Sequence, residues 1–277
     1  MKAVGVKGHP VLRSAITTFT WLISIIFFFP VFWITLISFR AEKDAGTFPP
    51  TWIAPFTFEN WTSIFQKGAA QYLINSAIAS VISVSLVLLL SYPAAYALSI
   101  KPIYRNKDVL SFFLSTKFLP PIAALLPLYL IFKNLHLLDN IWALSALYVT
   151  MNLPLSVWML RSFLKEIPTE LVEAAELDGA SIPKILFRVL APISLPGISA
   201  TALISFIFTW NEFLMAINLT GFHAATGPVY LVSFITAEGL FFAHLAAVSI
   251  VVSLPVVIAG WVAQDKLVRG LALGAVK

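Results

Sequence analysis

The chain of 277 residues is 59% hydrophobic and only 11% charged, whereas soluble domains carry about 25% charged residues. This composition indicates an integral membrane protein, and the length suggests one polytopic domain. Zero cysteines exclude disulfides, Cys-ligated metal sites and thiol catalysis. The net charge of +5 includes no basic run, which argues against nucleic acid as a partner.

Six apolar segments are long enough to cross a membrane, for which a helix needs about 20 residues. They cover residues 14–39, 72–99, 109–132, 141–163, 193–218 and 240–264. The first follows Lys2, Lys7 and Arg13, as the core of a signal peptide would, but its apolar run is about twice as long, so we expect an uncleaved span. The sequence therefore predicts an all-α membrane protein with six transmembrane helices in a single domain, residues 1–277.

The Lys and Arg residues between these segments indicate the orientation of the chain. With both termini in the cytoplasm, thirteen of them fall in inside segments and four in outside segments. The inside segments are 1–13, 100–108, 161–192 and 265–277, and the outside segments are 40–71, 133–140 and 219–239. This bias follows the positive-inside rule, so we expect cytoplasmic termini and a cytoplasmic loop at 164–192.

Two of the expected outer loops have a marked composition. Residues 40–71 are rich in proline and aromatic residues, and Trp52 and Trp61 are suited to lying along a membrane interface. Residues 219–239 form a glycine-containing loop that is long enough to project outwards.

Motifs for catalysis or nucleotide binding are absent from the sequence. It contains no phosphate-binding G-x-x-x-x-G-K-[ST], no G-x-G-x-x-G and no H-E-x-x-H. The four histidines, His9, His136, His223 and His244, are far apart and form no recognisable metal set. We therefore expect no metal site, no cofactor and no ATP hydrolysis on this chain.

The longest charged, helix-favouring stretch is Ile167–Pro196. It is typical of two short helices joined at Gly179, which can adopt the left-handed conformation that ends a helix. Ser181 can cap a second helix over Ile182–Leu190, and Pro192 would start the next span. The first helix has a small, shallow face formed by Leu171, Ala174, Ala175 and Asp178. Either this face docks a partner, or the segment is an amphipathic connector on the membrane surface.

Three short strings in this stretch resemble a known pattern. Glu173-Ala174-Ala175, Asp178-Gly179-Ala180 and the prolines Pro192 and Pro196 are similar in type and spacing to the EAA loop of binding-protein-dependent ABC importer permeases. Ala191 departs from that pattern, because leucine is commoner before the first proline. IPTELVEAAELDGAS, TWNEF at 209–213 and the ending LVRGLALGAVK resemble the maltose-type carbohydrate permeases. LSTKFLPP at 114–121 and AEGLFFAHLAAVS at 237–249 resemble the polyol (sorbitol or mannitol) permeases among them.

The resemblance implies a type I ABC importer permease fold in a bacterial inner membrane. Such a permease pairs with a second homologous permease, two copies of a cytoplasmic ATPase that bind ATP and Mg, and an extracytoplasmic sugar-binding protein. The residues that would contact the ATPase are Glu173, Ala174, Ala175, Asp178, Gly179, Ala180 and Pro192. The tail Leu267–Lys277 would reach toward the ATPase, and the 219–239 loop would probe the binding protein.

Polar and aromatic residues inside the expected spans are candidates for a sugar path, because sugars bind to amide groups and aromatic faces. They are Asn75, Lys117, Tyr148, Asn152, Trp158, Trp210, Asn211 and Glu212. Lys117 and Glu212 lie about 16 Å apart in depth at 1.5 Å per residue, so we expect no direct pair. For Lys117 the alternative is snorkelling to the headgroups, and for the others it is packing or hydrogen bonding between helices.

A second hypothesis is a stand-alone secondary transporter or channel, gated by the cytoplasmic helices. Such carriers commonly contain an inverted repeat and a carboxylate near the membrane midplane. The sequence has no visible repeat, and Glu212 lies off centre in its expected span. A membrane enzyme is disfavoured, because no nucleophile–base or metal constellation is present.

Overall fold

The computed structural model describes residues 10–101, 104–237 and 239–275, and most of them are helical. Four helices in this part of the chain are long and apolar enough to cross a membrane, and a bent pair makes a fifth candidate. The chain divides into two compact units: residues 1–67 with 234–250, and residues 68–233 with 251–277. Helix α14, Phe242–Ala275, begins in the first unit and ends in the second.

The first unit contains α1 (Pro10–Ser38), α2 (Glu42–Ala45), α3 (Glu59–Gln66) and the start of α14. Strands β1 (Ile235–Thr236) and β2 (Gly239–Leu240) pair antiparallel just before α14. Glu42 accepts hydrogen bonds from the backbone N–H groups of Ala243 (3.0 Å) and His244 (3.3 Å), and its carboxylate lies 2.7 Å from Nδ1 of His244. These bonds satisfy free N–H groups at the start of α14 and fix α2 beside it.

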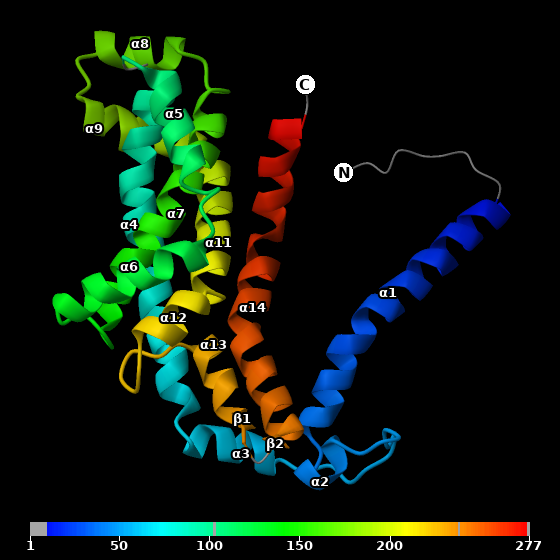
Figure 1. The fold of residues 1–277 in the computed structure, drawn as a ribbon. Helices are drawn as coiled ribbons and strands as arrows, with labels where there is room; N and C mark the ends of the chain where they lie inside the picture. The colour runs from blue at the N-terminus through cyan, green and yellow to red at the C-terminus, as the bar shows by residue number, and fades with distance from the viewer. Residues whose placement is uncertain (1–9, 102–103, 238, 276–277) are drawn as a thin grey trace. The chain divides into compact units, whose positions relative to one another are not determined.

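The second unit is built on α4 (Ala69–Ser99), α7 (Ile141–Leu164) and α11 (Leu195–Trp210), which lie side by side (Figure 1). Small polar residues join them: the Ser83 hydroxyl donates to the Ser145 carbonyl (2.9 Å), and the Ser156 and Ser205 hydroxyls are 3.0 Å apart. At Gly197 of α11 even a single added methyl group would collide with the ring of Phe163 on α7. Close approach at small residues and hydroxyl bonds between helices are typical of helix packing in membranes.

The continuous helix expected over 109–132 is wrong. The structure has two helices there, α5 (Asn106–Ser115) and α6 (Pro121–Asn134), separated by a turn at 116–120. Pro120 and Pro121 explain the break, because neither can donate a backbone hydrogen bond and each disfavours a helical residue before it.

The segment expected over 193–218 is also divided. α11 ends at Trp210, and α12 (Leu214–Leu219) follows after 211–213. Before α11, the helical stretch 182–193 is bent from it by 86°. That stretch consists of α9 (Ile182–Lys184), the π-helix η1 (Ile185–Leu190) and α10 (Ala191–Ile193), so Pro192 lies in α10 and does not start the span.

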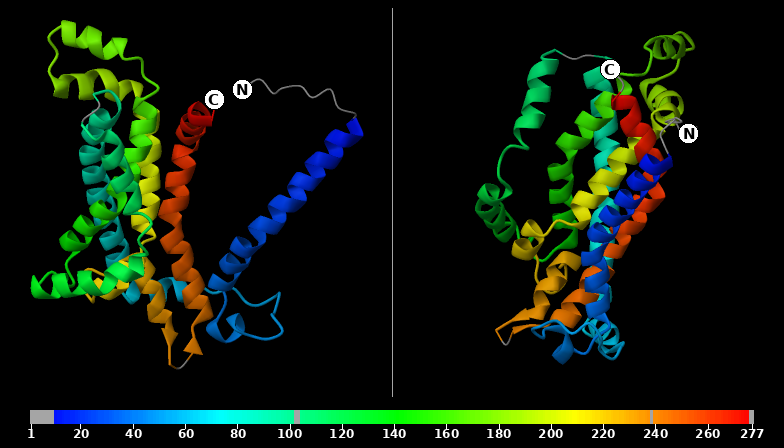
Figure 2. Two further views of the ribbon diagram at one scale, coloured as in Figure 1. Left: turned by 45° about the horizontal axis from the view of Figure 1, so that its top comes forward. Right: turned by 90° about the vertical axis from the view of Figure 1, so that its right-hand side faces the viewer.

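The remaining elements lie near the two ends of the second unit's long helices. α8 (Glu170–Leu177) and α9 lie at one end of α4 and α7, and α12 and α13 (Gly227–Tyr230) lie toward the other, as both views in Figure 2 show. The short 3₁₀ helix η2 (Leu231–Phe234) follows α13.

Candidate functional site

Helix α8 has defined signals at both ends. Backbone N–H groups of Val172 and Glu173 bond to the carbonyl of Thr169, and Glu170 and Glu173 place negative charge at the positive end of the helix dipole. At the other end Gly179 has φ +72°. The N–H of Gly179 bonds to the carbonyl of Glu176 (3.0 Å), and the next N–H, of Ala180, bonds to the carbonyl of Ala175 (2.9 Å). This pair of bonds is a Schellman motif, so the expected left-handed glycine is confirmed.

One face of α8 is fixed against α4, α7 and η1 of the same unit by apolar packing. Val172 is 2% exposed and lies in a buried cluster with side chains from α4, α7 and η1. The cluster consists of Tyr92, Ala95, Tyr96, Leu160, Leu164, Ile167, Val172, Ile185, Leu186 and Leu190. α8 is therefore attached to the ends of two spanning helices rather than lying free beside them.

A polar contact adds to this attachment on the outside. Nζ of Lys101, just after α4, lies 2.9 Å from Oε1 of Glu176 on α8. The hydrogen bond and the charge of Glu176 raise the pKa of Lys101 above its ordinary value. Both side chains are well exposed, so the pair orients α8 more than it stabilises the fold.

The opposite face of α8 is exposed and partly apolar. Leu171, Ala174 and Leu177 recur at intervals of three residues, and Leu177 is 90% exposed. The expected face is thus partly wrong: Ala175 packs against the buried cluster, and Leu177 joins Leu171 and Ala174 on the outside. Glu170, Glu173 and Asp178 are also exposed, so this apolar strip has an acidic rim.

The capping hydrogen bond that we expected from Ser181 at the second helix is not formed. Ser181 precedes α9 but makes no capping hydrogen bond with its side chain. The bend before α11 is instead held at Ser194, whose hydroxyl donates to the carbonyl of Leu190 (2.8 Å) and lies 2.7 Å from the hydroxyl of Tyr92 on α4.

Three of the residues expected along a sugar path come together where α7 meets the break after α11. The Tyr148 hydroxyl donates to Oε2 of Glu212 (2.9 Å), and the Asn152 amide donates to the Tyr148 carbonyl and to the Thr209 hydroxyl. Glu212 also accepts from the backbone N–H groups of Met215 (2.8 Å) and Ala216 (3.1 Å), so it caps α12. These bonds match the interhelical role that we gave as the alternative.

Three more of the expected path residues bond to groups outside this cluster. The indole N–H of Trp210 donates to the Val252 carbonyl (2.9 Å), and that of Trp158 to the Leu110 carbonyl (3.4 Å). The side-chain amide of Asn211 is exposed and bonds back to the Ile207 carbonyl. Of these three residues, Asn211 is exposed, Trp158 is partly buried and Trp210 is buried.

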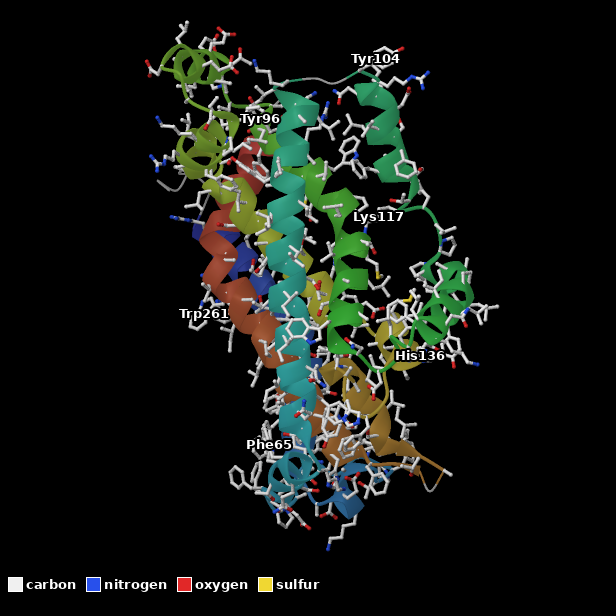
Figure 3. All side chains as sticks on the ribbon, turned by 90° about the vertical axis from the view of Figure 1, so that its left-hand side faces the viewer. Phe65, Tyr96, Tyr104, Lys117, His136 and Trp261 are labelled. Carbon is white, nitrogen blue, oxygen red and sulfur yellow. The ribbon has the colours of Figure 1, made fainter. Side chains whose placement is uncertain are left out.

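Lys117 lies at the break between α5 and α6, and its ammonium group donates to the Met151 carbonyl on α7 (Figure 3). It lines a recess of ≈ 270 Å³ together with Thr116, Leu119, Pro121, Ala124, Leu128, Leu147, Thr150, Met151, Pro154 and Met215. Among the described residues Lys117 and Glu212 form no ion pair: Lys117 bonds to the Met151 carbonyl, and Glu212 accepts from the Tyr148 hydroxyl.

Asn75 takes part in a second feature, a clamped loop that we did not predict. Its amide donates to the carbonyls of His223 and Ala225, both at 2.8 Å. The carboxylate of Asp139, in the turn before α7, accepts from the backbone N–H groups of Gly221 (2.8 Å), His223 (3.0 Å) and Ala224 (2.8 Å). Nearby, the Ser76 hydroxyl accepts from the N–H of Gly227. We refer to residues 220–227 as the clamped loop.

The charge of Asp139 is suited to this arrangement. Partial burial alone would raise the pKa of its carboxyl, but the three backbone N–H groups outweigh burial and hold that pKa below its ordinary value of 3.8. The only hint in the sequence is the Asp139-Asn140 pair before a span. Asn140 caps α7 by accepting from the N–H groups of Trp142 and Ala143, which leaves Asp139 free to bond elsewhere.

The side chains of the expected tail contact, Leu267–Lys277, lie outside the described residues. Among the described residues, no group of three or more His, Asp or Glu side chains is arranged to hold a metal ion.

The chain is similar to known proteins over nearly its whole length. Residues 88–268 match the family model described as binding-protein-dependent transport system inner membrane component. A probable ABC transporter permease protein of Sinorhizobium fredii is 36% identical over 267 residues, with 96% of each chain covered. The trehalose transport system permease protein of Mycobacterium tuberculosis is 33% identical, with 90% of this chain and 92% of that protein covered.

A solved structure shows the same fold. A chain of a bacterial ABC transporter involved in the import of the acidic polysaccharide alginate superposes with a TM-score of 0.75 at 21% identity, with 93% of this chain and 96% of that chain covered. The protein is therefore an all-α membrane protein with the fold of an ABC importer permease, and it belongs to the family of binding-protein-dependent transport system inner membrane components.

Proposed function

We propose that this chain is one permease subunit of an ATP-driven importer for a carbohydrate. It forms half of the translocation path together with a second homologous permease. It receives its cargo from an extracytoplasmic sugar-binding protein and takes its energy from a dimer of cytoplasmic ATPase subunits, which hold the ATP and Mg.

The two faces of α8 carry this proposal. Val172 fixes one face into the buried cluster at the ends of α4 and α7, whereas Leu171, Ala174 and Leu177 leave the other face open with an acidic rim. A connector lying on a membrane would bury its apolar strip in lipid, and its acidic rim would be repelled by anionic headgroups. An exposed strip of small and apolar side chains on a rigidly held helix fits a cleft in a soluble partner.

The same attachment explains how energy reaches the cargo path. A displacement of α8 by the ATPase moves α4 and α7 with it, since a close-packed cluster transmits movement rather than absorbing it. Rigid-body rocking of such helices against a second permease gives alternating access. The 86° bend before α11 connects this movement to α11, which ends at Trp210, two residues before Glu212.

The positions of two contacts on α4 support the orientation. Asn75 holds the clamped loop, and Tyr96 packs in the cluster that holds α8. Twenty-one residues separate them, or about 32 Å of helix, which matches the roughly 30 Å of a bilayer's hydrocarbon core. With α8 in the cytoplasm, the clamped loop faces the extracytoplasmic binding protein. The positive-inside bias of the sequence, and not this distance, is the reason for proposing cytoplasmic termini.

The cargo is proposed as a polyol, monosaccharide or small glycoside. Support comes from the trehalose transport named for one relative and from the polyol-type strings in this sequence. Lys117, Asn211 and Glu212, which are polar path residues with partly or well exposed side chains, are the first candidates for contact with it.

Charge reversal on α8 tests the proposal. Glu173→Lys should abolish ATPase binding and reduce ATP-dependent uptake at least tenfold, measured with radiolabelled trehalose and sorbitol in cells that also produce the partner subunits. Gly179→Pro should act in the same way, because proline cannot adopt φ +72°. Lys107→Glu, an exposed charge reversal in the first turn of α5, is the matched control and should transport normally.

Three outcomes would contradict the proposal. ATP-driven uptake by the Glu173→Lys complex at the normal rate would exclude α8 as the coupling helix. Uptake by the purified chain reconstituted without any ATPase would favour the stand-alone transporter. ATP hydrolysis by the chain itself, after rigorous removal of partners, would contradict the assignment of that activity to another subunit.

A further inference from the structure

The first unit contains an exposed apolar segment that the transport function does not explain. Residues 46–58, GTFPPTWIAPFTF, contain no charged residue and no histidine. Phe48 and Ile53 are 96% and 95% exposed, and Trp52, Phe56 and Phe58 are also exposed. Thirteen consecutive residues that are this apolar and uncharged are unusual for a loop in water. Exposed apolar patches of this kind mark a site of contact.

The segment is not a free loop, because buried polar groups hold it against the end of α1. Arg40, which is 2% exposed, donates to the carbonyls of Thr51 and Trp52, the latter at 3.0 Å. Its guanidinium lies 5.2 Å from the centre of the Trp33 ring. The N–H of Thr57 bonds to the carbonyl of Phe39 (2.7 Å), which closes the segment.

Ring contacts set the depth of the segment relative to α1. The Trp52 ring lies 5.0 Å from that of Trp33 and 6.5 Å from that of Phe29. Trp33 and Phe29 precede the end of α1 by five and nine residues, so they lie about 8 Å and 14 Å below it along the helix axis. The chain thus turns back beside α1 after leaving it.

These depths coincide with the lipid interface. A helix of 29 residues is about 44 Å long, close to the 40–45 Å of a bilayer with its headgroups. Each headgroup layer then takes up about 5–8 Å, so Trp52 lies where headgroups meet hydrocarbon. Tryptophan is enriched at this level of membrane proteins, where its ring faces both media.

We propose that Gly46–Phe58 is a membrane-inserted loop whose aromatic and apolar side chains lie among the lipids of the leaflet where α1 ends. The occupant of this surface is the bilayer itself. The only cation held against the segment, among the described residues, is Arg40, and its donors bond to backbone carbonyls of the segment. Insertion is therefore apolar and should not require anionic lipid. The inference rests on α1 crossing the membrane and not on the identity of the cargo or of the partners.

The absence of cysteine from the chain makes a direct test possible. Phe48→Cys and Ile53→Cys, each in the full-length chain, would be labelled with a nitroxide and reconstituted into phosphatidylcholine nanodiscs. Power saturation measures whether apolar oxygen or a water-soluble nickel chelate reaches the label. Phe27→Cys on the exposed surface of α1 is the lipid reference, and Leu177→Cys on α8 is the water reference.

We expect both labels in the loop to be reached by oxygen at least threefold better than by the nickel chelate, as at Phe27. Access by nickel equal to that at Leu177 would overturn the proposal in favour of a loop in water. Protection from both reagents would overturn it in favour of a loop covered by protein, such as a second permease chain. Insertion that appears only when phosphatidylglycerol is added would overturn the apolar mode of binding.

Discussion

Two regions at opposite ends of α4 are held in place by different physics. α8 is fixed by an apolar cluster around Val172, with one exposed ion pair outside it. The clamped loop is fixed by hydrogen bonds from its backbone to Asp139, Asn75 and Ser76. Apolar packing transmits force from any direction and does not depend on pH, whereas hydrogen bonds fix an exact backbone shape and depend on the charge of Asp139. These two solutions suit the proposed roles, in which α8 bears force from an ATPase and the clamped loop faces a binding protein.

The largest effect should follow from a charge placed in the buried apolar cluster that holds α8. Val172→Asp puts a carboxylate into the cluster, and burying such a polar group without a partner costs about 2–7 kcal/mol. We expect α8 to detach, with loss of amide protection over Glu170–Leu177 in hydrogen-exchange mass spectrometry. The clamped loop should keep its protection.

Leu171→Asp is the matched control, because the neighbouring side chain lies on the exposed face of α8. It should leave α8 protected while it weakens ATPase binding. If both variants expose α8 equally, apolar packing is not what attaches it.

The second effect concerns the clamp. Asp139→Asn keeps the shape of the side chain but removes the charge that three backbone N–H groups share. Hydrogen bonds to charged groups contribute about 1.5–3 kcal/mol, so amide exchange at Gly221, His223 and Ala224 should accelerate roughly 10- to 100-fold. Asp108→Asn, an exposed carboxylate beside Arg105, should change nothing at these amides. Unchanged protection in Asp139→Asn would mean that Asn75 and Ser76 suffice.

The features of α8 could be predicted from the sequence, whereas the clamped loop could not, because the first depend on neighbouring residues and the second on contacts between distant ones. Local rules identified four of the six spans, the left-handed Gly179 and the acidic first turn of α8, because each depends on neighbouring residues. The clamp depends on contacts between Asp139 and residues 82–85 positions later, which no local pattern contains. Proline did not identify the broken span either: Pro120 and Pro121 end a helix, yet Pro93, Pro154 and Pro255 lie inside helices. Only the surrounding packing decides whether a lost hydrogen bond is tolerated.

Acid should weaken the clamped loop but not the cluster around Val172, and its effect should be smaller than that of the mutations. The pKa of Asp139 is lower in the folded protein than its ordinary value of 3.8. The stability that its charge contributes is therefore fully present above about pH 4 and is lost as the pH falls through the folded value. Protection factors, corrected for intrinsic exchange, should fall at Gly221–Ala224 as the pH is lowered below about 4. The amides of the cluster residues Leu160 and Leu164 should keep their protection, and equal loss in both places would point to global acid unfolding.

The smallest effect tests the exposed ion pair on α8, and it has the opposite pH dependence. Glu176 raises the pKa of Lys101, so the contribution of this pair is present below the ordinary value of 10.5 and is lost as the pH rises through the folded value. Lys101→Met removes the pair and keeps the length of the side chain. Because both partners are exposed and screened by salt, α8 should stay protected at pH 7 with only slight fraying at Glu176 and Leu177. Loss of protection across the whole of α8 in this variant would show that the ion pair, and not the buried cluster around Val172, holds α8 in place.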